Sequence, residues 1–304
     1  MRLRFYFFFI FFTLFFLFYP GNSTYLDLFA YNRNLFIQNE KQVARKKEVL
    51  PIPVLRANEY PLISAEGAYV LDLPSFTPFF AKNEHQKFLP ASITKIMTAL
   101  VVRDLYKSSN EIVTVSNVET EGQVMGLAEG EQMTVENLLY GMLVYSGNDA
   151  AYAFAREKGY DEFIDQMNKK AKQLNMRDSH FSNPAGLDDY ANYSSPYDLA
   201  LAARELLKDP LLSKIVATRE ITVKDVEGQY THKLVNINRL LGEIPGLRGL
   251  KTGSTDLAGE NLVSFYKTTD HSFIIVVLKS TDRFADTKNV IDWINKNVDY
   301  LSTQ

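Results

Sequence analysis

The stretch Pro90-Ala91-Ser92-Ile93-Thr94-Lys95-Ile96-Met97-Thr98-Ala99-Leu100 places a serine and a lysine three residues apart at the start of an amphipathic segment. Apolar residues recur here at helical spacing, which predicts a helix with one buried face; they are Ile93, Ile96, Met97, Leu100, Val101 and Leu105. Because residues three apart share a helix face, we expect the Ser92 hydroxyl and the Lys95 amine to touch. N–H groups in a first turn lack helical partners, so the Ser92 amide is a candidate to bind an oxyanion. The pattern indicates a nucleophile beside its base.

A second Ser-x-x-Lys pattern occurs at Ser264-Phe265-Tyr266-Lys267. It lies in an alternating, β-rich stretch, where residues three apart point to opposite faces. The sequence therefore predicts that only Ser92 has the setting of a nucleophile.

Residues 1–23 have the pattern of an export segment. Met1-Arg-Leu-Arg4 precedes an apolar run from Phe5 to Tyr19, and basic residues before about 15 apolar ones are typical of a secretory signal. Gly21-Asn22-Ser23 offers small residues to a signal peptidase. The run also approaches the length of a membrane span. We predict a signal peptide or an N-terminal anchor that contacts the membrane through residues 5–19, and hence an exported, extracytoplasmic protein.

Composition excludes several classes of function. The chain has no cysteine, so disulfide and thiolate chemistry are excluded, and its formal net charge of −3 argues against a nucleic-acid partner. The four histidines lack the spacing of a metal site; they are His85, His180, His232 and His271. We predict neither a metal nor a cofactor.

The rest of the chain divides into a linker and one domain. Residues 24–59 resemble a stalk with a mixed charged run that ends at Pro51 and Pro53. Residues 60–304 form the predicted domain. Expected strands are Ala68–Leu73, Phe79–Ala81, Ile112–Val115 and several between Glu220 and Leu278; expected helices cover Thr134 to Leu174 with breaks at Ser146-Gly147 and Gly159, Ser195 to Leu207, and a final helix carrying Val290, Ile291, Ile294, Val298 and Leu301.

The expected elements follow the order strands, a block of helices, further strands and a closing helix. This order predicts a mixed α/β fold of the α+β type. Its expected architecture is an antiparallel sheet covered by helices, with an inserted all-helical lobe.

Two further motifs lie where one expected element ends and the next begins. Ser146-Gly147-Asn148 lies between two expected helices, so its side chains are free to project, although such a sequence also suits an ordinary turn. Lys251-Thr252-Gly253-Ser254 leads into a strand, where Gly253 would let a ligand backbone approach. Alternation predicts that Lys251 and Thr252 point to opposite faces.

Three motifs match, in chain order, the motif set of penicillin-recognising serine enzymes. They are Ser92-x-x-Lys95, Ser146-x-Asn148 and Lys251-Thr252-Gly253. From about Pro61 to Trp293 the chain resembles the low-molecular-mass penicillin-binding proteins of the serine-type D-alanyl-D-alanine carboxypeptidase family. Supporting flanks are Ala68-Tyr-Val-Leu-Asp72, Met125-Gly-Leu127, Thr134-Val-Glu-Asn-Leu-Leu-Tyr-Gly141, Asn183-Pro-Ala-Gly-Leu-Asp-Asp189 and Ala258-Gly-Glu-Asn-Leu-Val263. The resemblance implies a β-lactamase/transpeptidase-like fold.

The resemblance also implies a reaction and a substrate. Ser92 would form an acyl-enzyme on a peptidoglycan stem peptide ending in D-Ala-D-Ala, releasing the terminal D-alanine, and β-lactam antibiotics would acylate the same serine. Lys95 would be the base, with a pKa lowered by an apolar surround and by the cation Lys251. The amides of Ser92 and Ser254 would form the oxyanion hole.

The remaining roles follow from the same resemblance. Ser146 would relay a proton to the leaving amine, and Asn148 would hold the substrate amide. Lys251 and Thr252 would receive the terminal carboxylate, and Arg283 is a further candidate for that task.

Some features depart from the family, and alternatives stay open. Ser254 stands where relatives often have histidine, and the chain stops at Gln304, where many relatives continue into a β-rich domain and an anchoring helix. An endopeptidase acting on cross-links would use the same residues. A β-lactamase would need an additional glutamate, for which no Glu-x-x-x-Asn pattern is found after Asn148. A non-catalytic penicillin-sensing or wall-binding module is the third alternative.

Overall fold

The structure is a computed structural model that describes residues 2–18, 51–56 and 59–301. It consists of two units, which meet in the sequence between Leu50 and Pro51. In the first, the apolar run forms helix α1 (Arg2–Phe18). Within the described ranges, no helix combines the length and the apolar character needed to cross a bilayer. Most of the expected stalk and the expected cleavage site at Gly21–Ser23 lie outside the described residues.

The second unit is built on a five-stranded antiparallel sheet with the strand order β3-β2-β10-β9-β8. Its strands are β2 (Gly67–Asp72), β3 (Pro78–Lys82), β8 (Leu247–Thr255), β9 (Gly259–Lys267) and β10 (Ser272–Ser280). The predicted β2–β3 hairpin is confirmed, with Tyr69 opposite Ala81. Since β8 pairs on one side only, its other edge is free to face the helical part of the molecule.

Helices and small hairpins make up the rest of this unit. They are η1 (Ala91–Thr94), α3 (Lys95–Leu105), α4 (Val135–Leu143), α5 (Asn148–Glu157), α6 (Tyr160–Gln173), α7 (Pro196–Lys208), α8 (Pro210–Val216), α9 (Arg283–Asn297), and the pairs β4 (Ile112–Thr114) with β5 (Gln132–Thr134) and β6 (Glu220–Lys224) with β7 (Thr231–Val235). The breaks predicted at Ser146-Gly147 and Gly159 separate α4, α5 and α6. Ser195 caps α7 as predicted, since its side chain accepts a hydrogen bond from the Asp198 amide.

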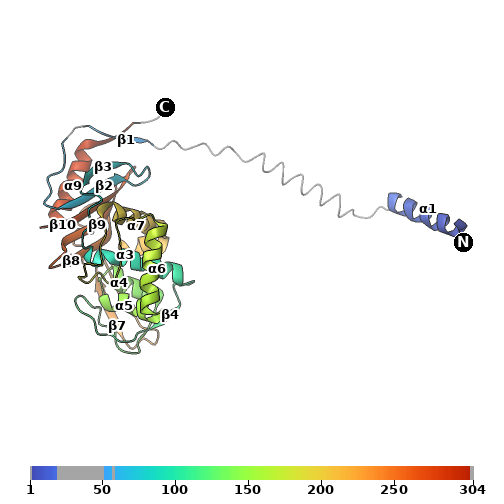
Figure 1. Cartoon of the computed structure of the whole chain (residues 1–304), viewed down its shortest axis with the longest axis horizontal. Coiled ribbons are helices and arrows are strands. Elements are labelled where there is room, and N and C mark those ends of the chain that lie inside the picture. Colours follow the sequence, from blue (N-terminus) through green and yellow to red (C-terminus); the bar gives the residue numbers. More distant parts are fainter. Residues whose placement is uncertain (1, 19–50, 57–58, 302–304) are drawn as a thin grey trace. The chain divides into compact units, whose positions relative to one another are not determined.

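Two hydrophobic cores lie on the two faces of the sheet. On one face, Ile274 and Val276 of β10 join the buried side chains of α3 and α7. On the other, Ile275 and Val277 pack with α9, as period-2 alternation requires. Figure 1 shows α4, α5 and α6 gathered into a lobe with α3, and α9 beside β10. The predicted α+β class, with an antiparallel sheet covered by helices and an inserted lobe, is confirmed. The lobe is not all-helical as predicted, because the strand pairs β4–β5 and β6–β7 pack with α4 and α5.

Two boundaries differ from the sequence prediction. The final helix ends at Asn297, and Val298 and Leu301 belong instead to strand β11 (Val298–Leu301). This strand pairs with β1 (Ile52–Leu55), a segment that the sequence assigned to the linker. Apolar spacing alone did not reveal that the chain end has a partner strand, so it was interpreted as a continuing helix.

Candidate active site

The serine and lysine of the first motif occupy a tight turn and the helix that follows it. Ser92 lies in the 3-10 turn η1 and is half-buried, and Lys95 is the first residue of α3 and is fully buried. Lys95 Nζ lies 2.8 Å from Ser92 Oγ, so the predicted contact is present. The same nitrogen donates to Asn148 Oδ1 at 2.7 Å and to the Ala185 carbonyl at 2.7 Å. These contacts aim the amine at the serine hydroxyl.

Burial changes the acid–base behaviour of this lysine. It lowers the pKa of Lys95 to about 7, while the nearby carboxylate of Asp149 acts in the opposite direction. The sequence prediction also invoked Lys251 as a cause. The repulsion between the two lysines instead lowers the pKa of Lys251. Burial is the largest cause of that lowering, and the charges of Lys95 and Arg283 add to it. A buried ammonium loses its hydration, so the neutral amine is favoured at both positions.

Ser146 and Lys251 form a second serine–lysine pair. Lys251 Nζ donates to Ser146 Oγ at 2.8 Å and to the Thr252 carbonyl at 2.9 Å, and both side chains are buried. Ser146 has a φ of 66°, in the left-handed region that non-glycine residues rarely adopt. The turn between α4 and α5 thus holds a strained residue whose hydroxyl meets the lysine of β8, a feature common at functional sites.

Strand β8 touches the Ser92 turn at Gly253. A Cβ atom on Gly253 would lie 2.9 Å from the Pro90 carbonyl oxygen and 3.0 Å from the Ser92 nitrogen. The sequence attributed this glycine to the approach of a ligand backbone. The structure shows that the protein's own turn is the backbone that approaches. Ser254 follows directly and its side chain is exposed.

Thr252 and Arg283 bring further polar atoms to β8. Lys251 is opposite Val263 of the helix-side core, and Thr252 is opposite Leu262 of the α9-side core, so the two point to opposite faces as predicted. Arg283 Nη1 donates to the Gly253 carbonyl at 2.8 Å. Thr252 Oγ1 and Arg283 Nε are buried without a hydrogen-bond partner among the described residues.

A loop that the motifs do not include supports the Ser92 turn. Asn183 Oδ1 accepts hydrogen bonds from the amides of Gly186 at 2.7 Å and Leu187 at 3.0 Å. A Cβ on Gly186 would come within 1.9 Å of the Ala91 carbonyl oxygen, at a φ of +84°. Only glycine fits there, and the close contact positions the Ala185 carbonyl against Lys95. The sequence showed this loop as a flank but not its contact with the lysine.

Asp149 holds another loop against the Ser146 turn. Its buried carboxylate accepts hydrogen bonds from the amides of Met125 at 3.0 Å, Gly126 at 2.9 Å and Leu127 at 3.1 Å. Because Asp149 follows Asn148 in the chain, these bonds also fix the start of α5. The neighbouring Asn148 Nδ2 donates to the Glu121 carbonyl at 2.6 Å.

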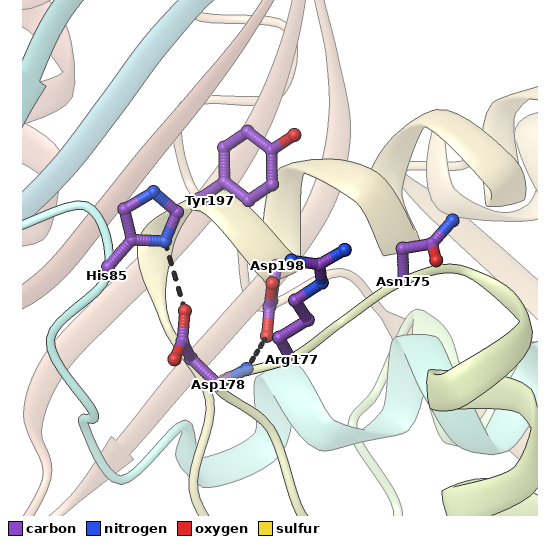
Figure 2. Close-up of a pocket in the computed structure, with 6 residues that line it drawn as sticks. All are labelled: His85, Asn175, Arg177, Asp178, Tyr197 and Asp198. Atoms are coloured by element: carbon purple, nitrogen blue, oxygen red, sulfur yellow. Dashed lines mark hydrogen bonds and ion pairs between the residues drawn. The ribbon is translucent and has the colours of Figure 1, made fainter.

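A separate pocket of about 580 Å³ is lined by none of these motif residues. Figure 2 shows the ring of His85 directed at Asp178, at 3.0 Å between Nδ1 and Oδ2, and Asp198 accepting from the Asp178 amide at 2.7 Å. The two carboxylates thus have partners within the protein. In the part of the chain that the structure describes, there is no cluster of three or more metal-ligating side chains.

The site can be compared with those of known proteins. A family model described as peptidase S11, D-alanyl-D-alanine carboxypeptidase, matches residues 55–282. The chain belongs to this family. Among curated relatives, it is 35% identical to the D-alanyl-D-alanine carboxypeptidase DacF of Bacillus subtilis over 75% of this chain and 61% of the relative, and 32% identical to DacD of Escherichia coli over 78% and 64%. The chain therefore spans less than two thirds of the length of these S11 relatives.

Solved S11-like structures share the fold. The Streptomyces K15 DD-transpeptidase is 31% identical, with a TM-score of 0.73, over 77% of this chain and 98% of that one. Penicillin-binding protein D2 of Listeria monocytogenes, in an ampicillin-bound form, is 28% identical with a TM-score of 0.69, over 77% and 99%. A curated relative from Streptomyces K15 is named a D-alanyl-D-alanine carboxypeptidase. The names of relatives thus cover both hydrolysis and transfer.

Proposed function

We propose that the protein is a serine-type D-alanyl-D-alanine carboxypeptidase that removes the terminal D-alanine from peptidoglycan stem peptides. The observation that carries the proposal is the 2.8 Å contact between Ser92 Oγ and the buried Lys95 amine. A neutral amine at this distance can accept the serine proton as the oxygen attacks a carbonyl. The family to which the chain belongs supports the choice of substrate.

In the first half of the reaction, Ser92 Oγ forms a bond to the carbonyl carbon between the two D-alanines while its proton passes to Lys95. The negative charge on the carbonyl oxygen is stabilised by the amides of Ser92 and Ser254. The close approach of Gly253 to the Ser92 nitrogen supports this role for the residue that follows Gly253. Ser146 relays the proton from Lys95 to the departing amine, so Lys95 becomes neutral again and Ser146 keeps a hydroxyl proton. The peptide C–N bond breaks, and D-alanine leaves with the proton.

In the second half, water adds to the ester carbonyl and gives up a proton to Lys95. The C–O bond to Ser92 breaks, the proton returns to Oγ, and the shortened peptide leaves. Asn148 holds the substrate amide throughout. No cofactor is needed, because every proton has a side chain to receive it.

The substrate carboxylate is assigned to the β8 end of the site. Arg283 supplies a cation there, and Lys251 and Thr252 supply an amine and a hydroxyl from the two faces of β8. Thr252 Oγ1 and Arg283 Nε lack hydrogen-bond partners among the described residues. An anion bound there would satisfy these buried donors. The requirement for a free terminal carboxylate is what distinguishes a carboxypeptidase.

The remaining expectations belong to the same proposal. Penicillins and other β-lactams acylate Ser92 and act as covalent inhibitors. The protein acts outside the cytoplasm on the cell wall, with residues 1–23 as signal peptide or anchor, residues 5–19 as the membrane contact, and the penicillin-binding domain connected through the 24–59 segment.

The proposal is tested by D-alanine release from a synthetic peptide ending in D-Ala-D-Ala, with the wild type and Ser92→Ala compared. We expect release by the wild type and none by the variant. A wild-type protein that binds penicillin yet releases no D-alanine would instead favour the non-catalytic penicillin-sensing module.

A further inference from the structure

His232 of strand β7 is a buried histidine that the proposed reaction does not use. It is 8% exposed, whereas His85 and His180 are exposed. Its Nε2 lies 2.7 Å from Oε1 of Glu131, a side chain that is also buried, and its Nδ1 lies 3.2 Å from the Met125 carbonyl oxygen. A carbonyl and an ionised carboxylate are both acceptors, so the ring serves both contacts by donating from each nitrogen.

The two contacts of His232 lie at the two ends of one loop, residues 125–131. This loop leads into β5, where the Gln132 carbonyl accepts a hydrogen bond from the Val226 amide at 2.8 Å. Val226 belongs to the segment between β6 and β7. The loop is therefore attached to the β6–β7 hairpin, and His232 makes the side-chain part of that attachment.

Met125, at the start of the loop, also contacts the turn that carries Ser146. A Cβ atom on Gly141 would lie 2.1 Å from Met125 Sδ, and one on Gly147 would lie 3.4 Å from Met125 Cβ. The Gly147 amide in turn donates to the Gly141 carbonyl at 2.9 Å, which closes the turn. Met125 thus packs against this turn with its side chain and contacts His232 with its carbonyl.

The Ser146 turn needs such support because its backbone is strained. Ser146 has a φ of 66°, and residues in sparsely populated regions persist only where the surrounding structure over-determines them. We propose that His232 is a positioning residue for the reaction, which acts through Met125 to hold the strained turn where the Ser146 hydroxyl can reach the leaving amine. The inference rests on the proposed function, in which Ser146 relays the proton to that amine.

Two substitutions at this one position separate the positioning role from a purely structural one. His232→Asn keeps an amide donor at the place of Nδ1, toward Met125, whereas His232→Gln keeps one at the place of Nε2, toward Glu131. The asparagine variant leaves a buried carboxylate without the ring, and the glutamine variant leaves only a carbonyl without it. The asparagine variant should therefore have the lower melting temperature, because an unpaired charged group costs more.

The acylation rate at saturating penicillin should rank the two variants in the opposite order. We expect it to fall at least about tenfold in His232→Gln and to stay within about threefold of the wild type in His232→Asn, because misplacing a reacting group by about 1 Å can cost about 100-fold. The dissociation constant of the noncovalent penicillin complex should change little in either variant, since chemistry and binding are measured separately. All rates are taken at a temperature where circular dichroism shows the variants folded.

A double-mutant cycle with Ser146→Ala tests the route of the effect. If His232 acts through Ser146, adding His232→Gln to Ser146→Ala should lower the acylation rate no further. An additive loss, an unchanged rate in His232→Gln, or rates that follow the melting temperatures would overturn the inference and leave the carboxypeptidase proposal standing. If the wild type is not acylated by penicillin and releases no D-alanine, the proposed function itself has failed.

Discussion

The candidate site contains two buried lysines, and each contacts the hydroxyl of a serine. Lys95 meets Ser92 within the first motif, and Lys251 of β8 meets Ser146 of the helical lobe. Both lysines are about 1% exposed or less. Burial without a carboxylate in direct contact favours the neutral amine at both positions. The first pair is proposed to be the nucleophile with its base, and the second pair is assigned to proton relay and carboxylate binding.

Acidic pH should reduce the rate of acylation. The pKa of Lys95 is lowered to about 7 by burial, and only the neutral amine can act as a base. Below that pH the protonated fraction rises, so the rate should fall about tenfold for each pH unit. The measurement is the second-order rate of penicillin acylation between pH 5 and 9.

Lys95→Arg should lose about 10²- to 10⁴-fold of this rate, because arginine keeps its charge at every pH in that range. Its fold is checked by circular dichroism. A flat pH profile together with an active Lys95→Arg protein would remove Lys95 from the role of base.

Some contacts of individual residues could be predicted from the sequence, and others could not. Spacing alone predicted the contact of Ser92 with Lys95 and excluded Ser264, which is buried on β9 while Lys267 is exposed. The contact of Ala185 with Lys95 joins residues 90 positions apart through a carbonyl. No side-chain pattern encodes a backbone acceptor, so this contact could not be predicted.

At the scale of elements, the site is where an edge strand meets a turn. Strand β8 brings Lys251 to Ser146 and places Gly253 against the Ser92 backbone. Asn261 of the neighbouring strand β9 donates through Nδ2 to the Leu89 carbonyl at 2.9 Å, which ties the turn to the sheet. The relative position of turn and strand therefore sets the geometry of the proposed oxyanion hole.

Gly253→Ala should separate these two elements. The new Cβ would press on the Pro90 carbonyl and the Ser92 nitrogen, and such overpacking costs about 1 to 3 kcal/mol. We expect a lower melting temperature and a loss of penicillin labelling of at least about 100-fold. Ser254→Ala is the control, since it alters an exposed side chain and keeps the amide, and it should label at close to the wild-type rate. Equal labelling of both variants would show that the close contact has no role.

Asp149→Asn tests the loop that covers the Ser146 turn. The carboxylate holds the amides of Met125, Gly126 and Leu127, and hydrogen bonds to a charged acceptor contribute about 1.5 to 3 kcal/mol. The variant should melt at a lower temperature. Because Asp149 raises the pKa of Lys95, the acidic limb of the rate profile should also move to lower pH. Asp165→Asn, at an exposed position on α6, should change neither quantity. An unshifted acidic limb in Asp149→Asn would remove the assigned electrostatic role.

Element boundaries were less predictable than element types. The strands and helices that were predicted occur in the predicted order, because hydrophobic periodicity and caps such as Ser195 are local signals. The short elements β5 and α8 were not predicted. Val298 was assigned to the last helix and Ile52 to the linker, although they lie on paired strands. Pairing between chain segments almost 250 residues apart is not a local signal, so no sequence pattern near either segment could reveal it.

At the scale of the whole molecule, the boundary of the domain can be tested by truncation. The second unit begins at Pro51, and its strand β1 pairs with β11 near the end of the chain. Arg56 adds an ion pair with Asp299. A fragment of residues 51–304 should melt like the full chain, whereas residues 60–304 should melt lower, by about 2 to 4 °C for each kcal/mol lost. Equal melting temperatures would place the boundary after β1.

The central claim is that Ser92 is the acylated nucleophile of a carboxypeptidase rather than of a β-lactamase. The most direct test is intact-mass spectrometry after stoichiometric penicillin, followed by peptide mapping, on the wild type and Ser92→Ala. The ring-opened antibiotic stays tethered near Ser92, and a missing second base costs about 10²- to 10⁴-fold in rate. We predict one adduct on the peptide that contains Ser92, lasting minutes or longer, and none in the variant. Label on Ser264, label in Ser92→Ala, or recovery of unmodified protein within seconds would contradict the account.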